Sequence, residues 1–428
     1  MIRKRCAYRV LLFLLLFLNS ACLFLTDDKK AGIAYLRELF IVVIVLVAVL
    51  LLLTWRRAQQ SRAGLWILFF GLVLPILSAL LARLNFGQPI GFGLLEERRS
   101  FLYLLFFPTL FLLIKAHPTQ AQLERFFVCC GIACVAVGYL YYFGWLPENT
   151  DVSFTVDEKD YGLNPLRPNR FSIGAPYVSA CAFMLMYRLK RSMSWLHLAL
   201  LLVFASYLWL VLQTRNTMLV WALAGLWIFR SRVGLLVKLG VLAGVVLLAA
   251  FFLAPDFFVA QLDRFDALLF EAREPGVRNV TTHIVIEEVA RNGLIGMGAL
   301  SLQWQGGFSR LYNGYFYLSD VGLLGVYYRF GFLAPAIALI YYVGFFRFMA
   351  YCGKKGDLLN ALQLTFWING INFLFSNTIM YGGEITGLSI AAFIYFAREQ
   401  DVIAAASPDK NRLPDASLRN HDALLRQR

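Results

Sequence analysis

The sequence has little of what soluble enzymes commonly use for catalysis. It holds four histidines and seven cysteines in 428 residues, and charged residues make up only 15% of it. It contains no HExxH zinc motif, no P-loop and no GxSxG nucleophile motif. The cysteines show no metal-ligand spacing, and most lie in apolar runs, where a thiol packs as a small apolar group. Zinc hydrolysis, ATP-driven work and serine-nucleophile chemistry are therefore unsupported, and we expect neither a metal site nor a cofactor.

Long apolar runs are abundant. Hydrophobic residues make up 60% of the chain and aromatic residues 16%, and the mean hydropathy is +0.65. A helix needs about 20 apolar residues to cross a bilayer. The runs are continuous rather than alternating, which predicts an all-α polytopic membrane protein and not a barrel. We predict about twelve spans, at residues 8–26, 35–54, 64–84, 100–115, 126–146, 171–187, 195–213, 216–229, 233–253, 321–346, 359–379 and 384–397.

The basic residues predict the orientation. Lys and Arg collect in alternate loops, while the outer loops are mixed or acidic, as in PENTDVSFTVDEKDYG. Because cytoplasmic loops are enriched in Lys and Arg, this places both termini in the cytoplasm. The net charge of +14 then reflects contact with anionic lipid, and we expect no nucleic-acid partner. The start of the chain also has the basic and apolar parts of a signal peptide, but we treat it as the first span.

The chain divides into four predicted parts. Residues 1–253 hold spans 1 to 9, residues 254–320 form a large periplasmic loop, residues 321–397 hold spans 10 to 12, and residues 398–428 form a polar, disordered cytoplasmic tail. The large loop is not a linker, since its apolar residues recur at helical spacing from residue 257 to 269. A second helix is predicted to stop at Asn292-Gly293. We expect amphipathic helices that cap the bundle at the outer surface.

Four arginines are the candidate functional residues of the predicted outer face. Arg215 occupies the turn before the eighth span, Arg278 opens the second helix of the large loop, and Arg310 precedes the tenth span. Arg329 lies about two turns inside that span. A guanidinium keeps its charge and presents a planar fork of donors, which suits phosphate oxygens. The pattern therefore indicates a site for a pyrophosphate at the membrane surface.

Three of these arginines have a plainer alternative. Arg215 would snorkel from a hairpin tip into the lipid headgroups. Arg278 would pair with Glu274 or cap its helix, and Arg310 would be a rim charge in contact with lipid. The sequence alone leaves both interpretations open for each residue.

Two further sites have alternatives of the same kind. Arg329 is costly at its predicted depth, but Asp320 or Glu384 would neutralise it as a structural counter-charge. His283 lies four residues before Glu287, so a surface pair on one helix face competes with a role in substrate binding or proton transfer.

The chain resembles a known family, the bacterial O-antigen ligase and Wzy-type polysaccharide polymerase superfamily. The most specific stretch is RNVTTHIVIEEVARNGLIGMGALSLQWQGGFSRLYNGYFYLSDVGLLGVYYRFG. Its pattern is an arginine-led helix (Arg278), a Gly-rich turn (Gly293 to Gly298), a His-Asn pair and an acidic residue before a GxxG. Here Tyr312-Asn313 stands in place of His-Asn, the proline of the turn is missing, and Asp320 is the acidic residue.

The resemblance implies a GT-C-like fold and a metal-independent, inverting glycosyltransferase in the bacterial inner membrane. It implies a glycan donor on undecaprenyl pyrophosphate, used at the periplasmic face. Arg215 and Arg278 would then stabilise the charge that grows on the leaving pyrophosphate. Asn313, Arg310 and Arg329 would contribute to substrate binding, and a chain-length regulator would be a further partner.

Tyr312 is a further candidate catalytic residue, and it is where the chain departs from the family pattern. A phenol with a pKa near 10 is a poor base at pH 7, which disfavours a ligase and favours a polymerase. Asp320, Glu287 and His283 remain as alternative bases. A ligase acting on lipid A core and a lipid-linked oligosaccharide flippase are the competing functions. A flippase is disfavoured because the charges gather toward the outer edge and the largest loop is single and off-centre.

Overall fold

The computed structural model is all-helical. Among its described residues there is no strand, and the isolated β-bridges are Phe24 with Ile33 and Ile295 with Gly331. Short breaks interrupt several helices, which end and restart without leaving the bundle. The structure describes residues 2–26, 31–55, 61–148, 170–256, 259, 277–312, 316–351, 356–375 and 379–406.

The first half of the chain forms the larger share of the bundle. A π-helical turn, η1, joins α4 to α5, and a second, η3, extends α10. The elements in order are α1 (Ile2–Asn19), α2 (Leu36–Thr54), α4 (Arg62–Leu68), η1 (Phe69–Val73), α5 (Leu74–Phe86), α6 (Ile90–Glu96), η2 (Arg98–Leu105), α7 (Phe106–Ala116), α8 (Gln120–Tyr142), α9 (Ala175–Arg191), α10 (Trp195–Tyr207), η3 (Leu208–Leu212), α11 (Arg215–Phe229) and α12 (Val233–Leu253).

The second half supplies an outer lobe and four more α-helices among the described residues. The outer lobe consists of α14 (Val277–Arg291), the extended segment 294–301 and α15 (Gly307–Leu311). The remaining elements are η4 (Leu318–Asp320), α16 (Leu323–Phe330), α17 (Ala334–Tyr351), α18 (Asp357–Phe375) and α19 (Gly383–Ala406).

Six helical segments are long and apolar enough to cross a membrane. This supports a multi-pass helical membrane protein, while the number of twelve spans stays a prediction. The six are Leu36–Thr54, Arg62–Phe86, Arg98–Ala116, Gln120–Tyr142, Trp195–Leu212 and Asp357–Phe375, and shorter apolar helices cover Asn216–Phe229, Ala334–Ala350 and Gly383–Ala397.

The structure corrects three predicted boundaries. The first helix stops at Asn19, and not at 26, because the chain turns back there. The predicted tenth span, 321–346, is not one helix, because Gly331 interrupts it with a φ of +56°. The last helix continues to Ala406, so the first part of the predicted tail is helical. Most of the predicted loop helix at 257–269, and the tail after 406, lie outside the described residues.

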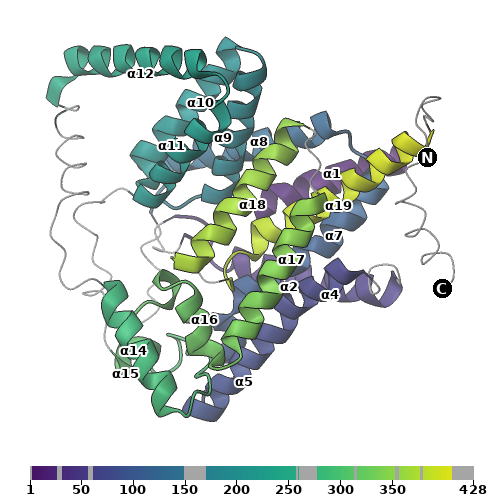
Figure 1. The fold of residues 1–428 in the computed structure, drawn as a ribbon, viewed down its shortest axis with the longest axis vertical. Helices are drawn as coiled ribbons and strands as arrows, with labels where there is room; N and C mark the ends of the chain where they lie inside the picture. The colour runs from purple at the N-terminus through teal and green to yellow at the C-terminus, as the bar shows by residue number, and fades with distance from the viewer. Residues whose placement is uncertain are drawn as a thin grey trace.

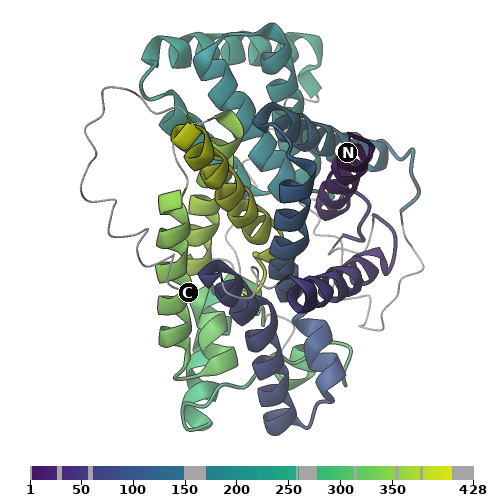
Figure 2. The same ribbon diagram turned by 90° about the vertical axis from the view of Figure 1, so that its right-hand side faces the viewer.

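Packing divides the molecule into a bundle and an outer lobe. Within the bundle α18 packs on α9, α19 on η2 and α7, and α1 on α7, while α14 packs on α16 in the lobe. Figures 1 and 2 place α12 at one end of the long axis and α5 and α14 at the other. The helix α12 covers the predicted ninth span, and it runs crosswise at its end of the molecule (Figure 1).

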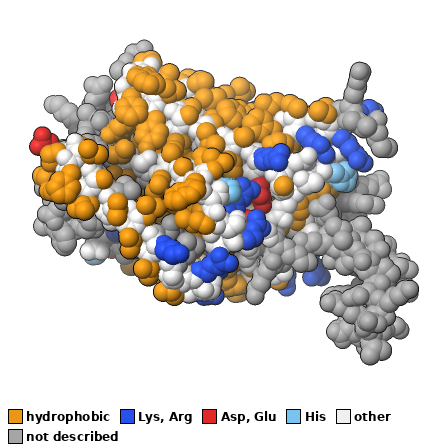
Figure 3. Space-filling model, turned by 90° about the horizontal axis from the view of Figure 1, so that it is seen from above, with side chains coloured by type: hydrophobic (Ala, Val, Ile, Leu, Met, Phe, Trp, Pro, Cys, Tyr) orange, Lys and Arg blue, Asp and Glu red, His pale blue; other side chains and the backbone are white. Residues whose placement is uncertain are grey.

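Several basic side chains lie at the α12 end. Seen from above, Lys and Arg side chains lie there beside a broad hydrophobic surface (Figure 3). One ion-pair cluster connects the end of α9 to the start of α18 and to α8. Arg191 of α9 lies 2.9 Å from Asp357 of α18, and Arg188 of α9 contacts both Asp357 and Glu124 of α8. The predicted orientation would assign this end to the cytoplasmic face, since inner loops are enriched in Lys and Arg.

Two glycines allow the segment 294–301 to run between α5 and α16. A Cβ on Gly298 would lie 2.3 Å from the backbone nitrogen of Ala82, and a Cβ on Gly296 would lie 2.2 Å from the carbonyl oxygen of Arg329. Gly298 also has a φ of +76°, which a side chain disfavours. The Gly-rich turn noticed in the sequence therefore serves close backbone packing.

We predict that Gly298→Ala lowers the free energy of unfolding by roughly 1–3 kcal/mol, because the added methyl group overpacks the contact with α5. Thermal unfolding in detergent measures the loss. Gly225→Ala in α11 is the matched control, since a Cβ there meets nothing within 4 Å. An equal melting temperature for Gly298→Ala and the wild type would contradict the assigned packing role.

Candidate functional site

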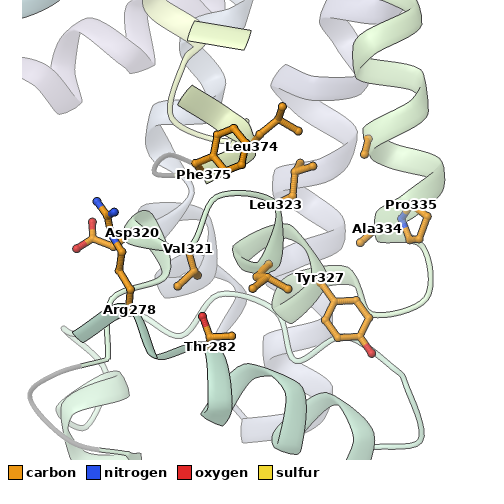
Figure 4. Close-up of a pocket in the computed structure, with 12 residues that line it drawn as sticks. Arg278, Thr282, Asp320, Val321, Leu323, Tyr327, Ala334, Pro335, Leu374 and Phe375 are labelled. Atoms are coloured by element: carbon orange, nitrogen blue, oxygen red, sulfur yellow. The ribbon is translucent and has the colours of Figure 1, made fainter. Parts of the chain in front are cut away.

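A pocket of about 480 Å³ lies where the outer lobe meets the bundle. It is built by α14, η4, α16, the start of α17 and the last turn of α18 (Figure 4). The helices α14 and α16 that line it lie away from the α12 end, on the side of the predicted outer face (Figure 1). The lining residues are Arg278, Thr282, Asp320, Val321, Leu323, Leu324, Tyr327, Ala334, Pro335, Ala338, Leu374 and Phe375.

One end of the pocket is polar. Arg278 lies in the first turn of α14, and Thr282 follows it one turn later on the same helix face. Asp320, the last residue of η4, lines the same pocket and is seen at the same end as Arg278 (Figure 4). The sequence therefore predicted two residues, Arg278 and Asp320, that the fold brings together from separate elements.

The rest of the pocket is apolar. Leu323 and Tyr327 of α16, Pro335 of α17, and Leu374 and Phe375 of α18 form this wall (Figure 4). The break between α16 and α17 is what lets both helices contribute to it. A charged end joined to an apolar wall suits an amphiphilic ligand with an anionic group.

Arg215 begins α11, and its side chain lies outside what the structure describes. Its neighbour Asn216 has its side-chain nitrogen 3.5 Å from the side-chain oxygen of Asn372 on α18. Two residues further along α18, Leu374 and then Phe375 line the pocket. The start of α11 and Arg278 therefore approach the same end of α18.

Arg329 is fully buried, with 1% of its side chain exposed. Its Nε donates to Oε1 of Glu97 at 2.7 Å, and Glu97 is itself 0% exposed. A second guanidinium nitrogen donates to the Tyr381 hydroxyl at 2.8 Å, and a third to the carbonyl oxygen of Gly325 at 3.3 Å. The hydrogen bonds satisfy the guanidinium within the protein.

This geometry corrects the predicted counter-charge of Arg329. Neither Asp320 nor Glu384 is the carboxylate in hydrogen-bond contact with it; that group belongs to Glu97. The sequence hides this pair, because 232 positions separate the two residues. A guanidinium without exposed surface has no face for a substrate, so the predicted substrate contact of Arg329 gains no support here.

The Glu97 carboxylate also organises the extended segment of the outer lobe. Ser78 of α5 donates its hydroxyl to Glu97 at 2.7 Å and accepts the Ala299 backbone N–H at 3.0 Å. Gln88 holds the same segment on its other side, accepting from the backbone nitrogen of Ser301 at 2.7 Å and donating to the carbonyl oxygen of Ala299 at 3.2 Å. The lobe is therefore attached to the bundle through buried polar contacts.

The run EERR at 96–99 is a site that sequence reasoning missed. Its second glutamate is the partner of Arg329, and its first arginine, Arg98, lies 3.2 Å from Glu38 of α2. The guanidinium of Arg99 lies 5.8 Å from the ring centroid of Tyr381. Four adjacent charges directly before an apolar run were a signal that such a contact network was present.

Tyr312, which stands where the pattern of the resembled family has a histidine, lies in an aromatic cluster with Phe308, Phe316 and Tyr328. Its hydroxyl hydrogen-bonds to that of Tyr328 at 2.7 Å, and its ring packs 4.6 Å from that of Phe316. Burial raises the pKa of Tyr312 to about 12. It is therefore a neutral phenol at pH 7. Asn313 lies outside the described residues.

The remaining predicted residues lie on the surface of the outer lobe. Nδ1 of His283 is 3.4 Å from a carboxylate oxygen of Glu287, and both side chains are largely exposed, as the surface-pair interpretation expected. Arg310 is exposed and reaches Gln305 at 3.4 Å. None of these side chains lines the pocket. Among the described residues no three His, Cys, Asp or Glu side chains come together as they would around a metal ion.

No family model, curated protein or solved structure matches the chain.

We predict that Arg329→Met or Glu97→Gln alone lowers the free energy of unfolding by roughly 3–5 kcal/mol, because each leaves its partner buried and uncompensated. The double variant should lose less than the sum of the two. The free energy of unfolding is measured in the same detergent for the wild type, the two single variants and the double variant, which completes a double-mutant cycle. Strictly additive losses would show that the two side chains do not depend on each other.

Proposed function

We propose that the chain is a polysaccharide polymerase of the bacterial inner membrane. In this proposal about twelve spans carry a GT-C-like fold with both termini in the cytoplasm. The enzyme transfers a glycan from undecaprenyl pyrophosphate to a growing lipid-linked chain at the periplasmic face. The product is an O-antigen, a capsule or an exopolysaccharide, and a chain-length regulator is a further partner.

The pocket is the observation that carries the proposal. Arg278 supplies a permanent positive charge at one end, and the walls of α16, α17 and α18 are apolar. A diphosphate attached to an isoprenoid chain has the same division, with a charged head and a hydrocarbon tail. Thr282 adds a hydroxyl donor beside Arg278, within reach of the same head group.

The chemistry proposed is a single inverting displacement. The acceptor hydroxyl oxygen forms a bond to the anomeric carbon while the bond from that carbon to the pyrophosphate oxygen breaks. The hydroxyl proton passes to a base, and the electron pair leaves with the lipid pyrophosphate. Arg278, joined by Arg215 from the start of α11, stabilises the charge that grows on the leaving group.

Asp320 is the base that the pocket favours. It lines the pocket, whereas His283 and Glu287 do not, and a carboxylate accepts a proton where the neutral phenol of Tyr312 does not. Because Asp320 and Arg278 line one pocket, the base shares the cavity with the leaving group. The surface pair His283–Glu287 is left without a catalytic task.

We predict that Arg278→Ala lowers the rate of glycan polymerisation by about 100-fold or more, as removal of one charge-stabilising donor does elsewhere. The assay follows the product ladder formed by purified protein from a lipid-linked repeat unit. Arg291→Ala is the matched control, since Arg291 lies on the same helix but pairs with Glu288 on the surface. Equal ladders from both variants and the wild type would remove Arg278 from the mechanism.

Deletion of the gene separates the competing functions, and we predict surface glycan that ends after one repeat unit. A polymerase is needed only to extend the first unit, so that unit still reaches its acceptor. Gel analysis of the extracted glycolipid reads the outcome. Bare acceptor would identify a ligase instead, and carrier-linked units that accumulate on the cytoplasmic face would identify a flippase.

A further inference from the structure

Four exposed apolar side chains gather where the outer lobe meets the start of α17. Leu294 and Ile295 follow α14, with 51% and 50% of their surfaces exposed. Phe332 and Leu333 lie between α16 and α17, with 64% and 36% exposed. We call these four residues the apolar knob. The aqueous surface of a protein does not usually concentrate large apolar side chains in this way.

Backbone contacts join the two halves of the knob. The backbone nitrogen of Phe332 donates to the carbonyl oxygen of Leu294 at 2.9 Å, and Ile295 forms an isolated bridge with Gly331. A Cβ on Gly331 would lie 2.1 Å from that same carbonyl oxygen, so only glycine allows the approach. The knob is therefore a built feature and not a chance meeting of two loops.

Leu294 holds a backbone conformation that usually belongs to glycine. Its φ is +66°, directly after Gly293 with a φ of +62°. A leucine in the left-handed region is strained, and a glycine would relieve that strain. The chain instead places a large apolar side chain there and leaves it exposed. Backbone strain of this kind is typical of positions that have a function.

The exposed apolar surfaces of two neighbouring helices lead to the knob. From the end of η1 along α5 the exposed side chains recur at helical spacing as Val73, Ile76, Leu80 and Leu84, and the last is 80% exposed. On α17 they are Leu339, Ile340, Val343 and Phe346. The first stripe belongs to a candidate membrane span and the second to a shorter apolar helix, so both face lipid in a membrane-crossing bundle.

The knob is fastened at the end of both stripes. The side-chain nitrogen of Asn85, next to Leu84, donates to the carbonyl oxygen of Gly296 at 3.0 Å. The side-chain oxygen of Asn85 accepts from Asn292 at 2.9 Å. Leu333 leads directly into α17 at Ala334. The lipid-facing surface therefore continues into the knob.

We propose that the apolar knob inserts into the outer leaflet of the bilayer and anchors the outer lobe there. Its partner is the acyl region of lipid, which accepts apolar side chains without a matched shape. Because the knob follows the C-terminal end of α14, it fixes the far end of the helix that carries Arg278 in its first turn. The neighbouring Ala334 and Pro335 line the pocket, so the anchor also fixes the pocket rim at the lipid surface.

Site-directed spin labelling of the full chain in phospholipid nanodiscs tests the proposal. Labels replace Ile295 and Phe332 in a background without Cys6 and Cys129, which are exposed, and without Cys352. Collision rates with oxygen and with a water-soluble nickel chelate report the depth of each label. We expect both labels to resemble one at Val343 on the lipid-facing stripe, with oxygen favoured several-fold over the chelate. A label at the exposed Gln303 serves as the aqueous control.

Two results overturn the proposal. Labels at 295 and 332 that collide with the chelate as often as the label at 303 would place the knob in water. Labels shielded from both reagents would show that protein covers it, from this lobe or from a partner chain. Leu294→Gly adds a check on strain: it should raise the melting temperature in detergent by a few degrees. None of these readouts uses glycan transfer, so they stand or fall separately from the proposed enzyme activity.

Discussion

The buried ion pair of Arg329 and Glu97 is the constraint on which the outer half of the structure depends. Two opposite charges without exposed surface must satisfy each other, because leaving either alone in an apolar interior is costly. Their shared contacts reach α5 through Ser78 and the extended segment through Ala299. One carboxylate therefore sets the positions of the bundle, the outer lobe and α16 together.

The ion pair also positions the pocket, because α16 contributes to both of them. The face with Arg329 is held by the ion pair, and Leu323 and Tyr327 line the pocket. A short helix of eight residues would have little reason to keep one orientation by itself. Gly331 then lets the chain turn into α17, so the apolar wall comes from two helices instead of one.

Hydropathy predicted most of the helix positions, and motif spacing predicted that Arg278 opens a helix and that Asp320 precedes the next span. These features are local, so a single stretch of sequence carries them. The partner of Arg329 and the break at Gly331 could not be predicted in this way. Each depends on a contact with a residue far along the chain, Glu97 in the first case and Leu294 in the second.

Charge alone does not distinguish an arginine with a structural role in a membrane protein from one that binds a ligand. Arg329 and Arg278 are both arginines of the predicted outer side, although only Arg329 interrupts an apolar run. Burial separates them: Arg329 has its donors occupied inside the protein, whereas Arg278 is exposed at the mouth of an apolar pocket. The first holds the wall in place, and the second is accessible to an anion that arrives on a lipid.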